Sequence, residues 1–335
     1  MVQPEISVIM PFFNAGKTLQ RALTSIADQT FRSFECIMVD NNSADDSAGI
    51  VRMFAGRDCR FISTEEKKQG VAFAFNRGAS LAKGRYIARM DADDEALPLR
   101  LEKQFNFLEN NPDYGAVTGL AEYIPHRSGT EGFRRYVDWS NSVLTYDQIM
   151  QNRFLEMPVI NPTAMWRKES GDKHGLYRHG NFPEDYDMWL RWLEAGVKVH
   201  KLGDVMIRWY DSDTRLSRTL DQYSDEAFFR LRTEFLSAWL ARNNPHHPDV
   251  AVWCAGRISR KWVSLLKEEG IAVQCYIDIR TNRQLDSKVI RYDEIPSPGD
   301  IFILVYMRHA EIRTRITEYL DQRGYISGKD YMLVG

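Results

Sequence analysis

Three acidic residues lie within four positions of this chain, at Asp91, Asp93 and Asp94. They directly follow residues 86–90, a run typical of a buried strand. Like charges this close repel one another, and a divalent cation, which takes oxygen ligands, would neutralise them. A solvated turn is an equally good interpretation of the run by itself, because Asp favours turns. The carboxyl end of a strand is, however, where open α/β sheets bind their ligands.

A further acid, Asp40, ends the strand predicted at residues 34–39. A carboxylate there can bind a ribose or a base edge through charge-assisted hydrogen bonds, although a polar turn is an equally good interpretation. The run from Pro11 to Gly16, after the first predicted strand, matches neither a Walker loop nor a dinucleotide fingerprint. By topology, the strand ends that carry Asp40 and Asp91 face one crevice. A diphosphate bound there would therefore need a metal, which the Asp-X-Asp cluster can hold.

Glu184 and Asp185 form a third group, at the start of the helix predicted at residues 184–196. A carboxylate at the rim of a pocket can act as a general base toward a hydroxyl group. The alternative is helix capping by Asp185, which stabilises a helix by about 1 kcal/mol.

The elements that must position these acids alternate between strands and helices. Apolar patterns predict strands at 6–10, 34–39, 59–62, 86–90, 197–202 and 205–210, and helices at 19–26, 47–54, 71–81 and 99–108. The alternation predicts an α/β fold with a mostly parallel sheet and helices on both faces. Segment 121–158 has no clear period, and we expect loops and short helices there over one edge of the sheet.

A second, smaller α/β domain is predicted after a polar, proline-bounded stretch at 243–248. The expected division is a first domain over 1–218, a linking helix with a Pro/His segment over 219–248, and a Rossmann-like domain over 249–335. Cys254 and Ser259 stand where a dinucleotide fingerprint has its first and third glycine. This departure favours a structural or interaction role for the last domain, including formation of a homo-oligomer, over nucleotide binding.

The composition excludes some classes of function. The chain has 335 residues and a net charge of −2, which argues against a nucleic-acid binder that neutralises phosphates. The four cysteines show no metal-ligand spacing and are typical of a reduced, cytoplasmic protein. No segment has the length of an apolar membrane span. We therefore expect a cytoplasmic protein, with peripheral contact at the inner face of the membrane left open.

Four segments, in this order, resemble the motifs of family-2 glycosyltransferases of the GT-A fold: Pro11-Phe12-Phe13-Asn14, Val39-Asp40-Asn41-Asn42-Ser43, residues 84–94 and residues 183–190. The resemblance implies an inverting transfer of a sugar from a nucleotide diphosphate donor, most often UDP-linked. It implies a saccharide or glycolipid hydroxyl as acceptor in surface polysaccharide synthesis, and Mn²⁺ or Mg²⁺ as cofactor. The segment after residue 248 resembles a Rossmann-like appendage of some members.

The resemblance also implies roles for individual residues on the donor side. Pro11, Phe12 and Asp40 would hold the nucleoside. Asp93 and Asp91 would bind the metal, with Asp93 as the direct ligand and Asp91 nearer the ribose.

On the acceptor side, the resemblance makes Asp185 the base that deprotonates the acceptor hydroxyl and Glu184 a residue that orients the acceptor. Looser matches are Gln69 and Asn76 for the base or ribose, and Arg208, Arg215 and Ser217 for a loop that closes over the diphosphate. Asn161 stands where relatives often carry His, which leaves the metal geometry and the choice of acceptor open.

Two alternatives belong to other functional classes. A sugar-phosphate nucleotidyltransferase has a similar sheet, but it usually carries a Gly-rich, basic loop after the first strand, and this chain does not. A non-catalytic scaffold that binds nucleotide sugars would be expected to lose Asp93 or Asp185, and both are present.

Overall fold

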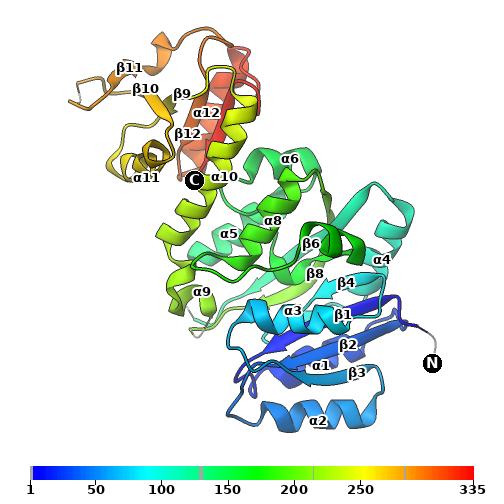
Figure 1. The fold of residues 1–335 in the computed structure, drawn as a ribbon. Coiled ribbons are helices and arrows are strands. Elements are labelled where there is room, and N and C mark those ends of the chain that lie inside the picture. The colour runs from blue at the N-terminus through cyan, green and yellow to red at the C-terminus, as the bar shows by residue number, and fades with distance from the viewer. Residues whose placement is uncertain (1–2, 128–130, 214, 283) are drawn as a thin grey trace. The chain divides into compact units, whose positions relative to one another are not determined.

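The structure is a computed structural model that describes residues 3–127, 131–213, 215–282 and 284–335, without the side chains of residues 216 and 217. The chain folds into two compact units (Figure 1). Unit 1 comprises Met1–Ile149 and Pro158–Tyr223, and unit 2 comprises Met150–Met157 and Ser224–Gly335. The division into domains at residues 218 and 248 stays a prediction, and the helix expected as a linker belongs to unit 2.

Unit 1 is built on a sheet with the strand order β3-β2-β1-β4-β7-β6-β8-β5. Its strands are β1 (Ile6–Phe12), β2 (Phe34–Asp40), β3 (Phe61–Glu65), β4 (Tyr86–Arg89), β5 (Glu95–Ala96), β6 (Tyr114–Ile124), β7 (Met165–Arg167) and β8 (Lys198–Tyr210). β1 is parallel to β2 and β4, β2 to β3 and β6 to β8, whereas β7 and β5 run antiparallel to their neighbours. The expected class of α/β sheet is therefore confirmed.

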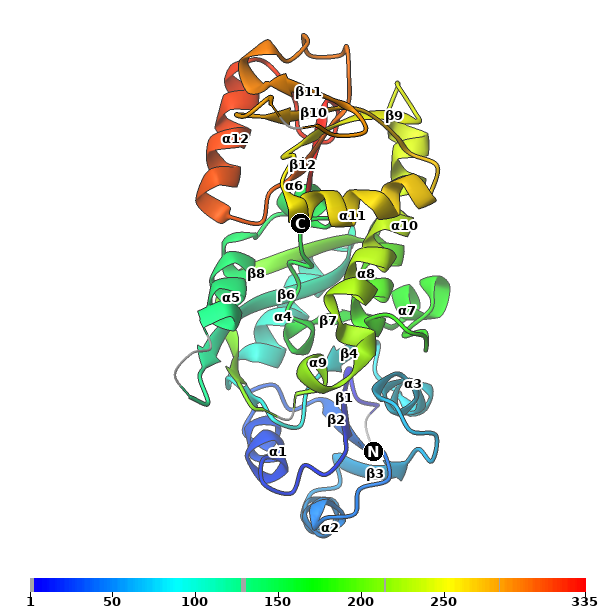
Figure 2. The ribbon, with the colours of Figure 1, turned by 90° about the vertical axis from the view of Figure 1, so that its left-hand side faces the viewer.

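Helices cover both faces of this sheet (Figure 2). The helices between residues 19 and 223 are α1 (Leu19–Ala27), α2 (Ser47–Arg57), α3 (Val71–Leu81), α4 (Arg100–Asn110), α5 (Glu131–Ser142), α6 (Tyr146–Asn152), α7 (Lys168–His174), α8 (Glu184–Glu194), α9 (Leu216–Thr219) and the short η1 (Asn161–Thr163) and η2 (Asp221–Tyr223). Ile6, Val8 and Met10 of β1 share a core with residues of α1, whereas Ile9 points to the other face and packs against Gly78 of α3. This alternation is expected of a strand buried on both faces.

Two predicted strands, 197–202 and 205–210, are one long strand, β8. Gly203 and Asp204 are residue types that favour turns. β8 nevertheless continues through them, because its register with β6 shifts at this point. Residues 202–204 therefore lie opposite Gly119 alone. A Cβ on Gly119 would lie 3.2 Å from the Asp204 carbonyl oxygen, so a glycine favours this bulge. Segment 121–158 holds the short helices α5 and α6, as expected, but it begins with the end of β6.

Gly84 lets the chain enter β4 closely packed against β1. A Cβ at this position would lie 2.6 Å from the Ser7 backbone nitrogen and 2.7 Å from the Ile6 carbonyl carbon. Because these are backbone atoms of a buried strand, they cannot move aside cheaply. We expect Gly84→Ala to lower the free energy of unfolding by about 1–3 kcal/mol, measured by urea denaturation. Gly56→Ala in α2 is the control, since an added Cβ there meets nothing within 4 Å; equal losses would contradict the clash.

Unit 2 contains the α/β fold expected after residue 248. Its elements are α10 (Asp225–Asn243), β9 (Asp249–Trp253), α11 (Arg257–Glu268), β10 (Ala272–Asp278), β11 (Lys288–Arg291), η3 (Tyr292–Glu294), β12 (Ile303–Tyr306), α12 (Ala310–Gln322) and β13 (Tyr331–Val334). The strands form a parallel sheet in the order β11-β10-β9-β12-β13.

The turn after β9 departs from a nucleotide-binding turn. Cys254, in place of the first glycine, has a φ of 98°, a conformation that favours glycine. Asp278, the acid at the end of β10, accepts a hydrogen bond from the Ala255 backbone nitrogen at 3.0 Å, so it helps to close this turn. The structural or interaction role of unit 2 stays a prediction.

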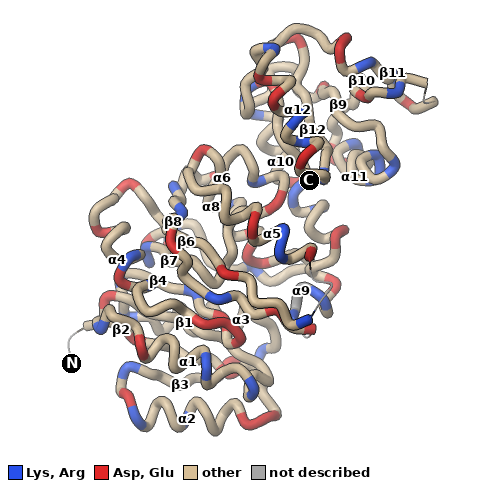
Figure 3. Tube along the Cα trace, turned by 180° about the vertical axis from the view of Figure 1, so that it is seen from behind, with Lys and Arg blue, Asp and Glu red and all other residues tan. Residues whose placement is uncertain are grey.

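Acidic and basic residues are interspersed along both units (Figure 3). The free thiols of the described residues are those of Cys36, Cys59, Cys254 and Cys275. Every helix in the described ranges is too short or too polar to span a lipid bilayer.

Candidate active site

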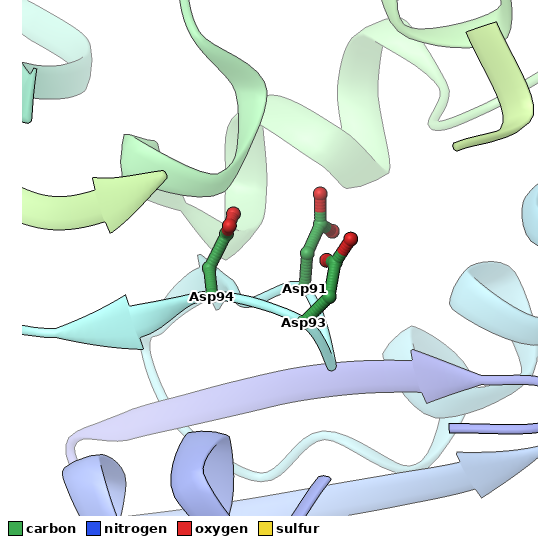
Figure 4. A group of neighbouring side chains, drawn as sticks. All are labelled: Asp91, Asp93 and Asp94. Atoms are coloured by element: carbon green, nitrogen blue, oxygen red, sulfur yellow. The ribbon is translucent and has the colours of Figure 1, made fainter. Parts of the chain in front are cut away.

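The acid loop, defined as Asp91, Asp93 and Asp94, follows β4 directly. One carboxylate oxygen of each residue lies within 4.8 Å of those of the other two. Figure 4 shows the three side chains leaving the loop toward the same side. Burial raises the pKa of both Asp93 and Asp94, and neighbouring carboxylates raise them further. The run is therefore both a turn and a cluster of charges that repel one another, which favours a cation.

Asp94 differs from the other two in its burial and in its bond to β8. It is fully buried, and its Oδ1 accepts a hydrogen bond from the Tyr210 backbone nitrogen at 3.0 Å. Arg215 lies behind it, with Nη2 at 3.6 Å from the same oxygen. Asp94 Oδ2 is buried and has no hydrogen-bond donor among the described residues. Asp94 therefore ties the acid loop to the end of β8, whereas Asp91 and Asp93 keep some exposed surface.

The residues expected to hold the nucleoside lie at the ends of two neighbouring strands. Pro11 and Phe12 end β1, and Phe12 is directly paired with Asp40 at the end of β2. Asp40 Oδ1 accepts a hydrogen bond from the Ser43 backbone nitrogen at 2.9 Å, which fixes the turn after β2. Because β1 also pairs with β4, Asp40 and the acid loop flank the same strand.

The two looser donor-side matches lie in different surroundings. Gln69 is next to the end of β2, where its Oε1 accepts a hydrogen bond from Asn42 Nδ2 at 3.1 Å. Asn76 of α3 instead donates to the Tyr177 carbonyl oxygen at 2.7 Å. The structure thus brings Gln69 close to Asp40 and holds Asn76 against the segment that precedes α8.

Asp185 lies in the first turn of α8, after Pro183 at the N-cap. The capping alternative is therefore wrong. Asp185 is half-buried, and its Oδ1 accepts a hydrogen bond from the Tyr186 backbone nitrogen at 2.7 Å. Burial raises the pKa of Asp185, the Arg89 guanidinium lowers it, and the Asp91 carboxylate raises it. The charge of the acid loop therefore affects the pKa of Asp185, as expected of two groups in one site.

Helix α8 is anchored by Asp187, a residue for which the sequence suggested no role. Its fully buried carboxylate pairs with Arg191 and Arg178, with Nε of each at 2.9 Å from Oδ2. Arg191 also donates to the carbonyl oxygens of His174 and Leu176. These bonds fix the start of α8 and hence Asp185. The spacing of Asp187 and Arg191, typical of a helical ion pair, is the signal that could have revealed them.

Glu184 is buried and accepts hydrogen bonds from η2. Its Oε2 accepts a hydrogen bond of 2.6 Å from the Tyr223 hydroxyl and one of 3.4 Å from Gln222 Nε2, both on η2. Burial, followed by the charge of Asp185, raises the pKa of Glu184 to about 7. The structure thus links Glu184 to the segment after β8, and its role toward an acceptor stays a prediction.

Glu184 gives the protein a pH-dependent stability. Because its pKa is raised from 4.5 to about 7, the stability it contributes is fully present below 4.5 and is lost as the pH rises through about 7. Glu184→Gln stays neutral, so at about pH 8 it should be more stable than wild type by about 1–3 kcal/mol. At pH 4.5, where the wild-type side chain is protonated in the fold, the two should be equal. Thermal unfolding at both pH values checks this, and equal gains at both would contradict it.

Arg208, one of the expected diphosphate contacts, forms ion pairs outside the acid loop. Arg208 of β8 pairs with Glu95 at 2.8 Å and Glu122 at 3.1 Å. The side chain of Ser217 lies outside the described residues. Arg215, from the same segment, is the arginine that reaches the acid loop, and the Arg208 and Ser217 roles stay predictions.

Asn161, which stands in place of the usual His, is buried and hydrogen-bonded to other side chains of the protein. It is 8% exposed, its Nδ2 donates to the Tyr177 hydroxyl at 2.8 Å, and its Oδ1 accepts from Trp189 Nε1 at 3.3 Å. Both ends of the amide are therefore occupied, which favours a structural role for Asn161 over contact with a metal or acceptor.

Comparison with known proteins decides the family. The model of the family described as Glycosyl transferase family 2 matches residues 7–175, which include the ends of β1 and β2 and the acid loop. The chain belongs to glycosyltransferase family 2. It is 30% identical to the O-antigen biosynthesis glycosyltransferase WbnJ of Escherichia coli, over 69% of this chain and 89% of WbnJ. The protein is therefore a glycosyltransferase, as expected.

Other relatives agree with this assignment, and a solved structure shares the fold. The amylovoran biosynthesis glycosyltransferase AmsE of Erwinia amylovora is 30% identical over 60% of this chain and 74% of AmsE. WfaP of Escherichia coli, named a UDP-Glc:alpha-D-GlcNAc-diphosphoundecaprenol beta-1,3-glucosyltransferase, is 27% identical over 58% of this chain and 72% of WfaP. TarS 1–349 of S. aureus, solved with UDP-GlcNAc, superposes with a TM-score of 0.54 at 15% identity, over 79% of this chain and 80% of TarS 1–349. This likeness concerns the fold, and the expected GT-A type is confirmed.

Proposed function

We propose that this glycosyltransferase transfers a sugar, with inversion at the anomeric carbon, from a UDP-linked donor to a hydroxyl group of a saccharide or glycolipid in surface polysaccharide synthesis. The observation that carries the proposal is the acid loop, with carboxylate oxygens of Asp91, Asp93 and Asp94 within 4.8 Å of one another at the end of β4. The names of WbnJ and AmsE, both enzymes of polysaccharide biosynthesis, support the acceptor class. TarS with UDP-GlcNAc and the UDP-Glc in the name of WfaP support the donor class.

A divalent cation, Mn²⁺ or Mg²⁺, fits the acid loop. Asp93 and Asp91 would hold it, because hard cations take carboxylate oxygens. Burial raises the pKa of Asp93, Arg215 and Arg21 lower it, and Asp91 raises it. The buried Oδ2 of Asp94 has no hydrogen-bond donor among the described residues, so the arginines compensate this carboxylate cluster only in part. When bound, the cation would supply charge neutralisation for the leaving diphosphate.

The nucleoside would bind at the ends of β1 and β2. The Asp40 carboxylate can accept charge-assisted hydrogen bonds from ribose hydroxyls. Pro11 and Phe12 lie on the neighbouring strand, and Gln69 lies beside the end of β2, where an amide can pair with a base edge. Asn76 is assigned to the ribose on the family resemblance.

Asp185 would act as the general base that takes the proton of the acceptor hydroxyl. The N-terminus of α8 and the Arg89 charge favour its ionised form against the effect of burial. As the acceptor oxygen bonds to the anomeric carbon, the bond to the diphosphate oxygen breaks on the opposite face, and its electron pair leaves with UDP. One such displacement inverts the configuration, and Asp185 retains the proton. Glu184, next to Asp185, would help to orient the acceptor.

The proposed site of action is the cytoplasm, with contact at the inner face of the membrane when the acceptor is a glycolipid. The free thiols Cys36, Cys59, Cys254 and Cys275 suit a reducing compartment. A homo-oligomer formed through unit 2 stays part of this proposal and can be checked by light scattering of the full chain.

An NMR time course tests the proposed reaction. The protein is incubated with Mn²⁺ and α-linked UDP-glucose, UDP-galactose or UDP-GlcNAc, with water or simple glycosides as acceptors. UDP release together with a β-configured product at early time points is expected. An α-configured first product would contradict inversion, and no UDP release with any nucleotide sugar would favour a binding scaffold.

A further inference from the structure

Arg89, the last residue of β4, places a positive charge inside the site that its neighbours satisfy only in part. The residue is 5% exposed, and its Nε donates a hydrogen bond of 2.7 Å to Asp91 Oδ1. Its Nη1 is buried and has no hydrogen-bond acceptor among the described residues. Burying a charge costs free energy that an ion pair often fails to recover, so stability is a weak reason for its presence. A use within the site explains it better.

Two aromatic rings fix the direction of the Arg89 guanidinium. Its central carbon lies 5.2 Å from the ring centroid of Phe75 on α3 and 5.8 Å from that of Tyr177, distances at which cation–π attraction acts. Tyr177 is held in turn by Asn161, whose amide also bonds Trp189 of α8. Arg89 therefore cannot turn away without disturbing α3, η1 and α8.

The charges that act on Arg89 come from both sides of the site. Asp91 of the acid loop contacts it directly, and the negative charge of Glu184 also acts on the guanidinium. On the other side, Arg89 lowers the pKa of Asp185, whereas the Asp91 carboxylate raises it. Asp91 and Asp185 thus repel one another, and Arg89 offsets that repulsion.

We propose that Arg89 is a positioning residue that couples the donor side of the site to the acceptor side. Through Nε it holds the Asp91 carboxylate in one orientation. Through Tyr177 and Asn161 it is linked to α8, the helix that carries Asp185. The inference rests on the proposed function, in which Asp91 serves the donor and Asp185 the acceptor hydroxyl. The inference adds that sugar transfer needs a directional hydrogen-bond donor and a positive charge at position 89.

Two substitutions separate these requirements. Arg89→Met removes both the charge and the donor, whereas Arg89→Lys keeps the charge but lacks the fixed fork of the guanidinium. We expect Arg89→Met to weaken UDP binding in Mn²⁺, measured by calorimetry, and to lower kcat for UDP release, each by about 10- to 100-fold, as for other groups that orient ligating carboxylates. In Arg89→Lys, kcat should return to within about tenfold of wild type while the affinity for UDP stays low.

Arg167 of β7 offers a matched control. It is half-buried and pairs in register with Tyr86, at the opposite end of β4 from the acid loop. Its Nε donates to the Tyr114 carbonyl oxygen at 3.0 Å, and its central carbon lies 5.6 Å from the Tyr86 ring centroid. Arg167→Met should lower the midpoint of thermal unfolding and leave UDP affinity and kcat per folded molecule unchanged.

The wild-type titration separates a failure of this inference from a failure of the proposed function. A wild type that binds no UDP in Mn²⁺ would overturn the proposed function and the inference together. If the wild type binds UDP and Arg89→Met behaves like Arg167→Met, only the inference is overturned. It is also overturned if Arg89→Met changes just one of the two quantities, or if Arg89→Lys restores neither.

Discussion

Replacing Asp185 by Asn is expected to lower kcat for sugar transfer by about 10²- to 10⁴-fold, the usual contribution of a general base. Asn has nearly the same shape, and its side-chain oxygen can still accept the hydrogen bond from the Tyr186 backbone nitrogen. The start of α8 should therefore be preserved, and affinity for the donor with it. UDP release measures the first quantity, and calorimetry with UDP and Mn²⁺ measures the second.

Asp172→Asn is the matched control for this prediction. Asp172 lies on α7, and its side chain is 65% exposed and pairs with Lys168 at 3.4 Å. The same substitution there should change neither quantity. Full transfer by Asp185→Asn would show that the base is another group, and loss of UDP binding together with transfer would point to a structural defect.

Asp93→Ala should remove the Mn²⁺-dependent part of UDP binding, a loss of about 100-fold or more if the cation contributes several kcal/mol. The substitution should not unfold the protein without metal. Burial and the Asp91 charge raise the pKa of Asp93, and Asp93 in turn raises that of Asp94. Removing one carboxylate therefore relieves repulsion, and the midpoint of thermal unfolding without metal should stay level or rise. Calorimetry with and without Mn²⁺, beside a melting curve, measures both.

Asp113→Ala controls for the loss of an acid from a turn. Asp113 is exposed in the turn before β6, in the same unit, and takes no part in the acid loop. Its loss should leave UDP affinity unchanged with and without Mn²⁺. If Asp93→Ala retained Mn²⁺-dependent binding, the assignment of the metal to the acid loop would be wrong.

The strands that carry the acids could be predicted because their own residues favour a buried strand. β1 and β2 are buried along almost their whole length, so continuous β-prone runs mark them. The strand β8 could not be predicted as one element, because Gly203 and Asp204 suggest a turn. Its continuity depends on pairing with β6, where Gly119 leaves room for the bulge. Such pairing is a tertiary property that local patterns do not contain.

The difference between local patterns and tertiary contacts also decides what could be predicted of the candidate site. Topology was enough to expect that the strand ends carrying Asp40 and the acid loop would face one crevice, and in the structure the two flank β1. The bond between Asp94 and Tyr210 was not predictable, because it joins residues 116 positions apart in the chain. The contacts of Arg89 and of Glu184 with Tyr223 depend likewise on how α8, η1 and η2 pack. Sequence therefore indicated the residues that would meet substrate, and the structure was needed for those that hold them in place.

The most direct test of the account is a thermal-shift panel of nucleotides and nucleotide sugars, with and without Mn²⁺, on the wild type and Asp93→Ala. A ligand that binds the folded state raises the unfolding midpoint by mass action. The account predicts a Mn²⁺-dependent rise with UDP compounds in the wild type, largest for the true donor, and none in Asp93→Ala. A rise only with NAD-type ligands, or one that is equal in Asp93→Ala, would contradict it.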